Sequence, residues 1–321
     1  MTVPNKRKKV RSVLKWVMWV LIAQLLLINF SAALYGYKLT YFYEAHTNPS
    51  PAPRNIFTKT WRLFTGPQFQ KSVVEEIPHF SYQTIQLITK DKLHIEGWYI
   101  PVDSAKGTVI LVHGLGGNKS ILLSQAYEFR YFGFNVLLID LRAHGNSDGN
   151  VTTLGYSESE EVKLAYDYVS SRGQRNIILY GISLGAAVIS KAVADFDLSP
   201  SRIILEIPFN SQEELFAKRG TLLGFPEEPF GVLVTFWASV ERGFNAFKEK
   251  TSKYVRKIKC PVLLEYAARD ELVPEEETIS IFKNIASKDK RLVKFQNANH
   301  EFLLNKEREK WREEISLFLF K

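Results

Sequence analysis

The sequence predicts an α/β fold, in which helices cover both faces of a mostly parallel β-sheet. From about residue 82 onward, short stretches rich in Val, Ile and Leu alternate with longer stretches of helical periodicity. Strands that alternate with helices in this way form βαβ units, whose strands run parallel. We expect eight strands, at residues 84–89, 93–100, 108–113, 135–140, 176–181, 202–207, 261–266 and 291–296.

Helices are expected between these strands and after the last of them. The predicted helices cover residues 118–132, 157–172, 184–196, 274–287 and 306–320. Only Lys90-Asp91-Lys92 separates the first two strands, which predicts an antiparallel hairpin. Strand 108–113 is a continuous apolar run, typical of a buried parallel strand. In such sheets the functional residues lie at the carboxyl ends of the strands.

Residues 208–257 interrupt the alternation and predict a cap inserted between two strands. The segment carries many large apolar side chains, namely Phe209, Leu215, Phe216, Leu222, Leu223, Phe225, Phe230, Leu233, Phe236 and Trp237. Two interpretations are open for them. Either they line a site for a lipophilic substrate, or they pack the cap onto the domain.

The N-terminal region predicts a membrane anchor. Residues 1–15 form a basic tail with no acidic residue, and residues 16–37 carry no charge. At about 1.5 Å per residue the uncharged segment spans about 33 Å, enough for a transmembrane helix through a hydrocarbon core of about 30 Å. The basic tail places the N-terminus in the cytoplasm and the rest of the chain on the other side. The alternatives are a signal peptide cleaved near Ser31-Ala32-Ala33 and a monotopic or buried helix.

Residues 38–81 are expected to connect this anchor to a folded domain at residues 82–321. The Pro-rich segment 48–53 predicts an extended stretch. After it, the apolar residues of the connector alternate with basic ones, at Phe57, Lys59, Trp61, Arg62, Leu63 and Phe64. This pattern predicts a short amphipathic element that either lies on a membrane surface or packs against the domain.

Charge and cysteine content exclude several kinds of function. The chain carries 42 basic and 34 acidic residues, but six basic residues lie in the tail, which leaves 36 basic and 34 acidic residues in the rest. A nearly neutral domain has no broad basic face, so no nucleic-acid partner is expected. Cys260 is the single cysteine, which excludes an intrachain disulfide, and no Cys/His spacing indicates a zinc site.

Ser183 is the predicted nucleophile. It lies in residues 181–185, Gly-Ile-Ser-Leu-Gly, which match the pattern G-x-S-x-G between an apolar strand and a helix. Small neighbours let a serine occupy the strained turn that this pattern requires. Residues 145–149 match the same pattern at Ser147, but no strand runs directly into them. We therefore interpret Ser147 as part of a loop.

A serine hydroxyl needs a base, and the base needs an acid. His300 is the only histidine after Ser183, and it lies between the last strand and the last helix. Asp270 follows strand 261–266, so the chain order is Ser, Asp, His, as in hydrolases with this sheet. Glu271, next to Asp270, is a competitor for the role of the acid. Asp289 precedes a strand and therefore lies at the amino ends of the strands, away from the expected site.

An oxyanion hole is expected where strand 108–113 ends in His-Gly-Leu-Gly-Gly-Asn. Glycines at this point let backbone N–H groups turn toward a developing negative charge. We assign the two donors to the amides of Leu115 and Leu184, the latter following the nucleophile. His113 is interpreted as structural.

Three segments together resemble the α/β-hydrolase superfamily, in the branch with a serine aminopeptidase or monoglyceride-lipase type of core. They are residues 113–116 (His-Gly-Leu-Gly), 140–147 (Asp-Leu-Arg-Ala-His-Gly-Asn-Ser) and 181–185. The resemblance covers about residues 82–321 and implies a triad of Ser183, Asp270 and His300, an acyl-enzyme and no cofactor. It also implies that residues 142–147 shape the pocket without reacting. The branch includes esterases, lipases, thioesterases and peptidases, so it does not identify the substrate.

The expected function is hydrolysis of carboxylic esters, with a lipophilic acyl substrate and the lipid bilayer as partners. A thioesterase is one alternative. A serine peptidase for short peptides is another, if Glu206, Glu213 or Glu214 binds a free α-amino group. A non-catalytic membrane scaffold on a hydrolase fold is the third. The sequence does not indicate the oligomeric state.

The expected location is a membrane with a single pass and an extracytoplasmic catalytic domain. Asn118 and Asn150 lie in N-glycosylation sequons. A glycan on Asn118 would crowd the predicted oxyanion loop. This favours a compartment without N-glycosylation, such as a bacterial envelope.

Overall fold

A computed structural model of the chain describes residues 6–44 and 55–320. Its centre is a sheet of eight strands in the order β10-β9-β8-β7-β5-β6-β4-β3. Strand β4 runs antiparallel to both of its neighbours, and the other pairs are parallel. The predicted α/β class and mostly parallel eight-stranded sheet are confirmed. The strands are β3 Gln83–Ile88, β4 His94–Ile100, β5 Thr108–Val112, β6 Asn135–Ile139, β7 Ile177–Ile182, β8 Arg202–Glu206, β9 Val262–Ala267 and β10 Lys290–Phe295.

The apolar content of each strand matches its place in the sheet. Every residue of the inner strands β5, β6 and β7 is buried, because helices cover both of their faces. The edge strand β3 alternates exposed and buried residues over its second half. Alternate side chains of β5 enter different cores, Ile110 and Val112 on one face and Val109 and Leu111 on the other.

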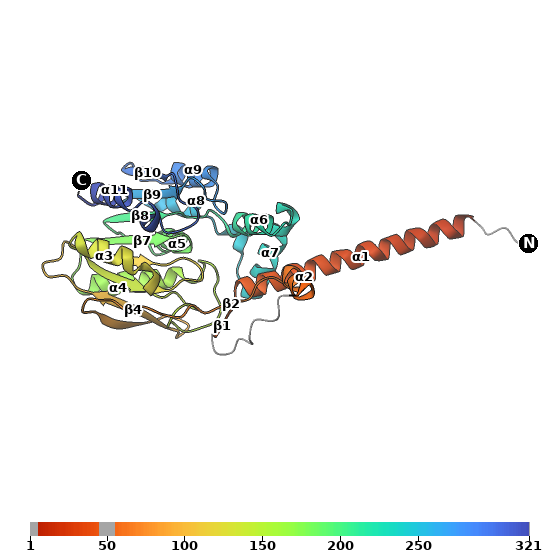
Figure 1. Ribbon diagram of the computed structural model, residues 1–321, viewed down its shortest axis with the longest axis horizontal. Helices are drawn as coiled ribbons and strands as arrows, with labels where there is room; N and C mark the ends of the chain where they lie inside the picture. The colour runs from red at the N-terminus through yellow and green to blue at the C-terminus, as the bar shows by residue number, and fades with distance from the viewer. Residues whose placement is uncertain (1–5, 45–54, 321) are drawn as a thin grey trace, which may run out of the picture.

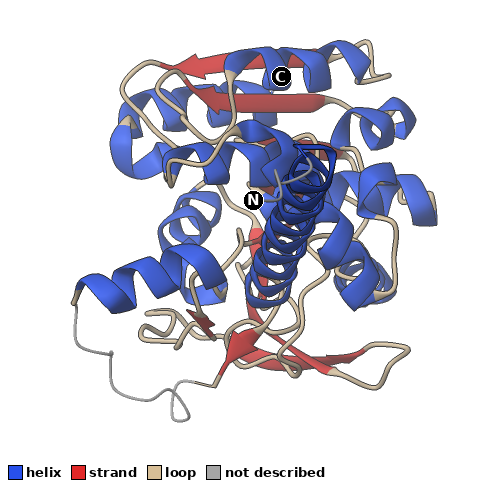
Figure 2. Ribbon diagram, turned by 90° about the vertical axis from the view of Figure 1, so that its right-hand side faces the viewer, coloured by secondary structure: helices blue, strands red, loops and turns tan. Residues whose placement is uncertain are grey.

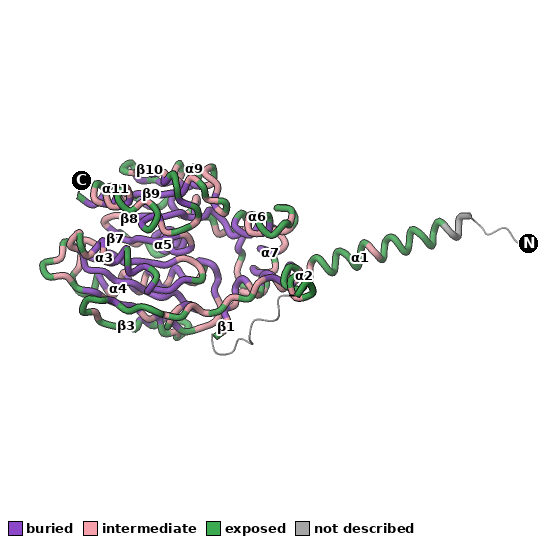
Figure 3. Tube along the Cα trace, viewed as in Figure 1, coloured by how far each residue is buried: buried purple, intermediate pink, exposed green. Residues whose placement is uncertain are grey.

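Five main helices form the layers on the two faces of the sheet. On one face lie α4 Ser159–Ser171, α5 Leu184–Phe196 and α9 Glu275–Asn284. On the other lie α3 Leu123–Tyr131, which follows a 3-10 turn, and α11 Arg308–Phe320. Figure 3 shows buried residues concentrated in the sheet and these helices. The predicted helix 306–320 begins two residues later, at Arg308, because α10 Leu303–Lys306 forms a separate turn before α11.

The predicted insertion folds as the helices α6 Gln212–Leu222 and α7 Glu227–Arg242, followed by the short α8 Thr251–Tyr254. We call residues 212–242, which comprise α6, α7 and the loop between them, the cap. Small residues let its two helices approach closely, since a Cβ on Gly231 would lie 2.8 Å from the Cβ of Ala217. The cap lies at the end of the molecule from which α1 departs (Figure 1).

Helix α1 Lys6–Leu39 extends away from the body for most of its length (Figure 1). Its large apolar side chains are exposed from Val10 to Phe30, whereas Ala32, Tyr35 and Leu39 are buried. The helix therefore continues beyond the predicted uncharged span and ends inside the folded body. It is long and apolar enough to cross a membrane.

The last turns of α1 pack on the cap. The Tyr35 ring makes edge-on contacts with the rings of Phe225 and Phe230, at 6.0 and 5.1 Å between centroids. Gly36 permits close contact with α7, since a Cβ there would lie 2.9 Å from the backbone nitrogen of Ala238. The aromatic side chains of the predicted insertion thus contribute to docking the anchor onto the cap.

The connector contributes two short strands and one helix. Strands β1 Phe42–Tyr43 and β2 Phe69–Gln70 pair in parallel. Helix α2 Ile56–Thr65 lies between them in the sequence, and the side chain of Asn55 caps it by accepting from the Thr58 amide at 2.8 Å. The predicted Pro-rich segment 48–53 lies outside the described residues.

Candidate active site

Ser183 lies in a sharp turn between strand β7 and helix α5. Its backbone has φ 51° and ψ −112°, which is strained for a residue with a side chain. A Cβ on Gly181 would lie 2.5 Å from the carbonyl carbon of Gly185. One on Gly185 would lie 2.1 Å from the Val112 carbonyl oxygen of strand β5. Both glycines of the motif are required because the turn packs on itself and on the neighbouring strand.

The three predicted triad residues meet at the carboxyl ends of their strands. Ser183 Oγ lies 2.9 Å from His300 Nε2, and His300 Nδ1 lies 2.7 Å from Asp270 Oδ2. Asp270 Oδ1 accepts from the amides of Leu272 and Val273, at 2.9 and 2.8 Å, which orients the carboxylate. The Asp270 side chain is 2% exposed and that of His300 is 20% exposed. The histidine is thus accessible at the site while its acid partner is shielded.

The competing residues lie in different surroundings. Ser147 is fully buried, and its hydroxyl donates to the Asp140 carbonyl oxygen at 2.8 Å and accepts from the Glu96 amide at 2.9 Å. Glu271 is exposed. Asp289 precedes β10, and its carbonyl oxygen accepts from the amide of Val262, the first residue of β9. Asp289 therefore lies at the amino ends of the strands.

The loop after β5 lies directly against the serine. A Cβ on Gly114 would lie 3.5 Å from the Cβ of Ser183. Within the described part of the chain, the amides of Leu115 and Leu184 donate to no other group. The next amide, of Gly116, is engaged, because it donates to His144 Nε2 at 3.0 Å. The two amides assigned to the oxyanion hole are thus available, and their neighbour holds the loop.

Two buried histidines support this loop. His113 Nε2 accepts from the Leu141 amide at 3.0 Å, and its Nδ1 donates to the Gly114 carbonyl oxygen at 2.7 Å. His144 Nδ1 donates to the Arg142 carbonyl oxygen at 2.8 Å. Burial lowers the pKa of His113 to about 4 and that of His144 to about 3. Both rings are therefore neutral near pH 7 and act as acceptors for the amides.

A buried ion pair beneath the loop was not predicted from the sequence. Lys119, which is fully buried, donates from Nζ to Asp140 and to Glu96 Oε1, the latter at 2.9 Å. Asp140 also accepts from the amides of Lys119 and Asn146, at 2.6 and 2.8 Å. Burial raises the pKa of Asp140, while Lys119 lowers it. This pair joins the start of residues 119–122 to the 140–147 loop.

Glu206, one of the three candidates for binding an amino group, is occupied within the core. Its carboxylate accepts from the Tyr180 hydroxyl at 2.6 Å, the Trp311 indole at 3.1 Å and the Leu303 amide at 3.0 Å. Glu265 lies beside it in the sheet register. Burial raises the pKa of both carboxyl groups. Glu206 is therefore inaccessible to a substrate.

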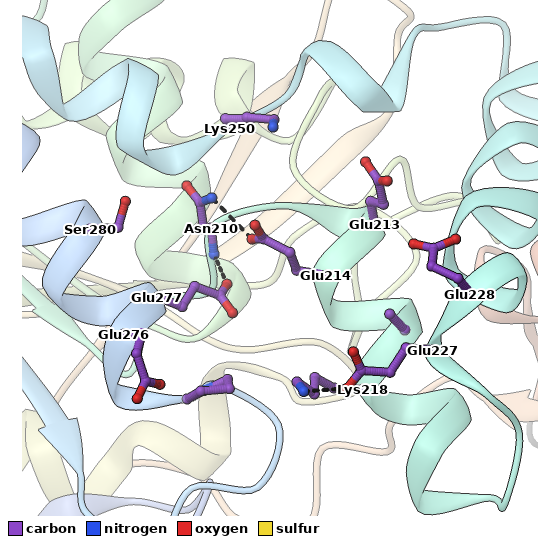
Figure 4. A pocket seen from close by; sticks show the side chains of 12 residues that line it. Asn210, Glu213, Glu214, Lys218, Glu227, Glu228, Lys250, Glu276, Glu277 and Ser280 are labelled. Atoms are coloured by element: carbon purple, nitrogen blue, oxygen red, sulfur yellow. Dashed lines mark hydrogen bonds and ion pairs between the residues drawn. The ribbon is translucent and has the colours of Figure 1, made fainter.

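Glu213 and Glu214, in contrast, line a cavity of about 560 Å³ between the cap and α9 (Figure 4). The backbone amide of Asn210 donates to Glu277, and its side chain donates to Glu214 Oε2 at 3.0 Å. Burial raises the pKa of Glu277 to about 8. Ser183 does not line this cavity, whose walls are Asn210, Glu213, Glu214, Ala217, Lys218, Glu227, Glu228, Lys250, Pro274, Glu276, Glu277 and Ser280. Over the described ranges, no His, Cys, Asp and Glu side chains gather in a group that could hold a metal ion.

The chain is similar to known proteins. A family model described as serine aminopeptidase S33 matches residues 103–223 and 235–307, more than half of the chain. The uncharacterized protein YqkD of Bacillus subtilis is 25% identical over 229 residues, which cover 70% of this chain and 75% of that protein. An uncharacterized membrane protein of Saccharomyces cerevisiae is 25% identical over 228 residues, 68% of this chain and 73% of its own. A lysophosphatidylserine lipase of Danio rerio is 28% identical over 193 residues, 55% of this chain and 47% of its own.

Solved structures agree on the fold. An esterase of Pyrococcus furiosus has a TM-score of 0.66 at 24% identity, covering 78% of this chain and 95% of its own. An esterase of Exiguobacterium antarcticum has a TM-score of 0.58 at 18% identity, covering 74% and 100%. With this family match on a shared fold, the chain belongs to the serine aminopeptidase S33 family and has the α/β-hydrolase fold.

Proposed function

We propose that this protein is a membrane-anchored hydrolase of carboxylic esters that uses Ser183 as its nucleophile. The observation that carries the proposal is the chain of hydrogen bonds from Ser183 through His300 to Asp270, at 2.9 and 2.7 Å. The strained turn at Ser183 adds support, because a position of this kind persists only where the surrounding structure holds it.

Acylation begins when Ser183 Oγ attacks the carbonyl carbon of the ester. His300 Nε2 takes the hydroxyl proton as the new C–O bond forms. Asp270 accepts from His300 Nδ1–H, which selects the reactive tautomer and stabilises the imidazolium. The carbonyl oxygen becomes negative and accepts hydrogen bonds from the amides of Leu115 and Leu184.

Collapse of the tetrahedral intermediate breaks the bond to the leaving alcohol. The imidazolium of His300 gives its proton to the leaving oxygen, and the acyl group remains on Ser183. A water molecule then enters, loses a proton to His300 and attacks the acyl carbon. The carboxylic acid leaves, and Ser183 recovers its proton from the imidazolium.

A lipophilic acyl substrate is supported by location and by relatives. The large apolar side chains of α1 are exposed over Val10 to Phe30, which suits a lipid environment for the anchor. One relative is named a lysophosphatidylserine lipase. The cap aromatics give less support, because Phe225 and Phe230 contact Tyr35 of the anchor.

The proposed topology has a cytoplasmic N-terminus and an extracytoplasmic catalytic domain. The basic tail supports this orientation. Asn118 is 2% exposed, and its side-chain amide donates to the Val73 carbonyl oxygen at 2.9 Å. A residue held in this way does not carry a glycan in the folded protein, which supports a compartment without N-glycosylation. Protease added to intact cells should digest the domain, and full protection of the domain would reverse the orientation.

The proposal is tested with a fluorophosphonate probe and a panel of acyl esters. Wild-type protein should be labelled and should hydrolyse the esters, and Ser183→Ala should do neither while keeping its melting temperature. Comparison of esters of increasing chain length then identifies the acyl preference. Absence of labelling in folded wild-type protein would refute the proposed nucleophile.

A peptidase is the second candidate, favoured by the acidic cavity beside the cap. Glu213 and Glu214 are the lining residues that the sequence predicted for binding a free α-amino group. The matched test compares aminoacyl amides with their N-acetylated counterparts. If the peptidase is correct, only the free amines are cleaved, and the double variant Glu213→Gln, Glu214→Gln raises their KM.

A further inference from the structure

Helix α2 exposes its apolar face, which is the reverse of a helix in a water-soluble domain. Ile56, Phe57, Trp61 and Leu63 are exposed by 80%, 74%, 54% and 44%. At 100° per residue these four side chains share one side of the helix, together with Thr60 and the half-buried Phe64. The buried residue of α2 is Thr65, which lies on the other side. A helix that packed on the domain would bury the first set instead.

Polar contacts attach α2 to the end of α1. The hydroxyls of Ser31 and Tyr35 donate to the carbonyl oxygens of Phe64 and Leu63, respectively. Lys38 Nζ donates to Thr65 Oγ1 at 2.9 Å and to the Gly66 carbonyl oxygen at 3.3 Å. These bonds use the last turn of α2 and leave its apolar side free.

The attachment lies where the exposed part of α1 ends. Exposed apolar side chains extend from Val10 to Phe30, and the bonds to α2 begin at Ser31. A hydrocarbon core of about 30 Å takes about 20 residues at about 1.5 Å each, so a core that begins after Lys15 ends near Tyr35, where α2 is attached. If α1 crosses a bilayer, α2 therefore lies at the level of its surface.

The axis of α2 runs in a direction that suits a helix lying at the membrane surface. In Figure 1 α1 extends across the view and α2 is seen nearly along its axis. In Figure 2 α1 points toward the viewer, and the helix that follows the grey segment lies across the view. The two helices are therefore crosswise. A helix crosswise to a membrane-spanning one runs along the membrane surface.

We infer that α2 is an interfacial helix, whose partner is a phospholipid bilayer. Ile56, Phe57, Trp61 and Leu63 enter the boundary between headgroups and acyl chains. Lys59, exposed at the edge of this face, pairs with anionic headgroups, whereas Arg62, also exposed, lies on the opposite side of α2, which contains no acidic residue. This second contact turns one end of the body toward the bilayer.

The end of the body that α2 turns toward the bilayer is the end that carries the cap. Cap helices α6 and α7 lie at the same end of the molecule as α2 (Figure 1). They also expose apolar side chains of their own, namely Leu222, Leu223, Phe236 and Val240. The inference thus assigns the membrane-facing side to the cap. It does not depend on the proposed reaction.

Spin labels on the full chain in phosphatidylethanolamine and phosphatidylglycerol nanodiscs test the inference. Cys260 is the only native cysteine, so Cys260→Ala gives a background for single labels. Labels go to Phe57→Cys and Trp61→Cys on the apolar face, and to Arg62→Cys as the matched control on the opposite side of the same helix. Asp103→Cys, exposed on the body, gives the fully aqueous reference.

Power saturation then compares collisions with oxygen, which is enriched in lipid, and with a water-soluble nickel chelate. Labels at positions 57 and 61 should favour oxygen at least about threefold over position 62, which should resemble position 103. Nickel access at all four positions would overturn the inference, and so would low access to both reagents at 57 and 61, which marks a protein cover. Unchanged melting temperatures show that the variants are folded. The readout needs no turnover, so it can fail or succeed independently of the proposed reaction.

Discussion

The chain contains the string G-x-S-x-G twice, and the two copies have opposite surroundings. Ser147 is fully buried and uses its hydroxyl to join the Asp140 carbonyl oxygen to the Glu96 amide. Ser183 has a strained backbone and a hydroxyl 2.9 Å from a histidine. A strand that leads straight into a helix distinguishes the second copy. Local context, and not the string, separates a structural serine from a candidate nucleophile.

The two copies are also connected. His144, next to the first copy, accepts from the Gly116 amide at 3.0 Å. Gly116 lies in the loop that carries the Leu115 amide beside Ser183. The first copy therefore supports the loop on which the proposed chemistry of the second depends. Variants at matched positions of the two copies separate support from chemistry.

Replacing the two serines should give the largest contrast. Ser183→Ala should reduce kcat by at least about 10³-fold, because the nucleophile is removed. Ser147→Ala should keep activity within about tenfold but lower the free energy of unfolding by about 1–3 kcal/mol, because a buried amide and carbonyl lose their partner. Ester hydrolysis and denaturant unfolding measure the two effects. Equal loss of kcat in both variants, at unchanged stability, would contradict the assignment.

Replacing one glycine in each copy should give a smaller difference, which appears in the free energy of unfolding. Gly185→Ala should destabilise the fold by more than about 3 kcal/mol, because the methyl group would overlap a backbone oxygen of β5. Gly149→Ala meets no atom within 3.7 Å, but its φ of 85° costs about 1–2 kcal/mol. Denaturant unfolding measures both. A similar cost at both positions would show that backbone strain alone, and not close packing, requires the glycines.

The smallest effect is expected in the pH dependence of stability. Unfolding raises the pKa of His144 from about 3 toward its ordinary value of about 6.5, so the unfolded state binds protons that the folded state does not. The neutral His144 therefore makes its full contribution to the free energy of unfolding above pH 6.5. About 1 kcal/mol of that contribution is lost between pH 6.5 and 5.5.

Comparison with wild-type protein isolates this contribution. Buried carboxyl groups such as Glu161 and Glu277, whose pKa values are raised to about 8, change stability in the opposite direction with pH. The difference in unfolding free energy between wild type and His144→Asn should therefore shrink by about 1 kcal/mol from pH 6.5 to 5.5. The exposed His94→Asn serves as control and should show no such change. A constant difference for His144→Asn would mean that folding does not lower the pKa of its ring.

The fold could be predicted from the sequence because its strands are continuous apolar runs between turn residues. The candidate triad followed from the strand before Ser183 and from the chain order of Asp270 and His300. Contacts between distant segments could not be predicted in this way. Lys119 meets Asp140 only because β5 and β6 are neighbours in the sheet.

The N-terminal region shows the same limit. The composition of α2 was compatible both with lipid and with packing on the domain. Only its attachment to Ser31 and Tyr35 distinguishes the exposed face from the covered one. The docking of α1 on the cap likewise joins residues about two hundred positions apart, as in the bond between Arg242 and Thr40. No local sequence pattern predicts a contact between residues so far apart in the chain.

This docking has a mechanical consequence. Arg242 of α7 donates to Thr40 Oγ1 at 2.7 Å and to the Tyr37 carbonyl oxygen at 3.1 Å, so the cap and the end of the anchor are joined as one body. The same end of the anchor is also joined to the sheet side of the body, because the Thr152 amide donates to the Thr40 carbonyl oxygen at 3.0 Å. On the proposed membrane arrangement, the end of α1 therefore holds both the cap and the sheet, with Ser183, at a fixed height above the bilayer.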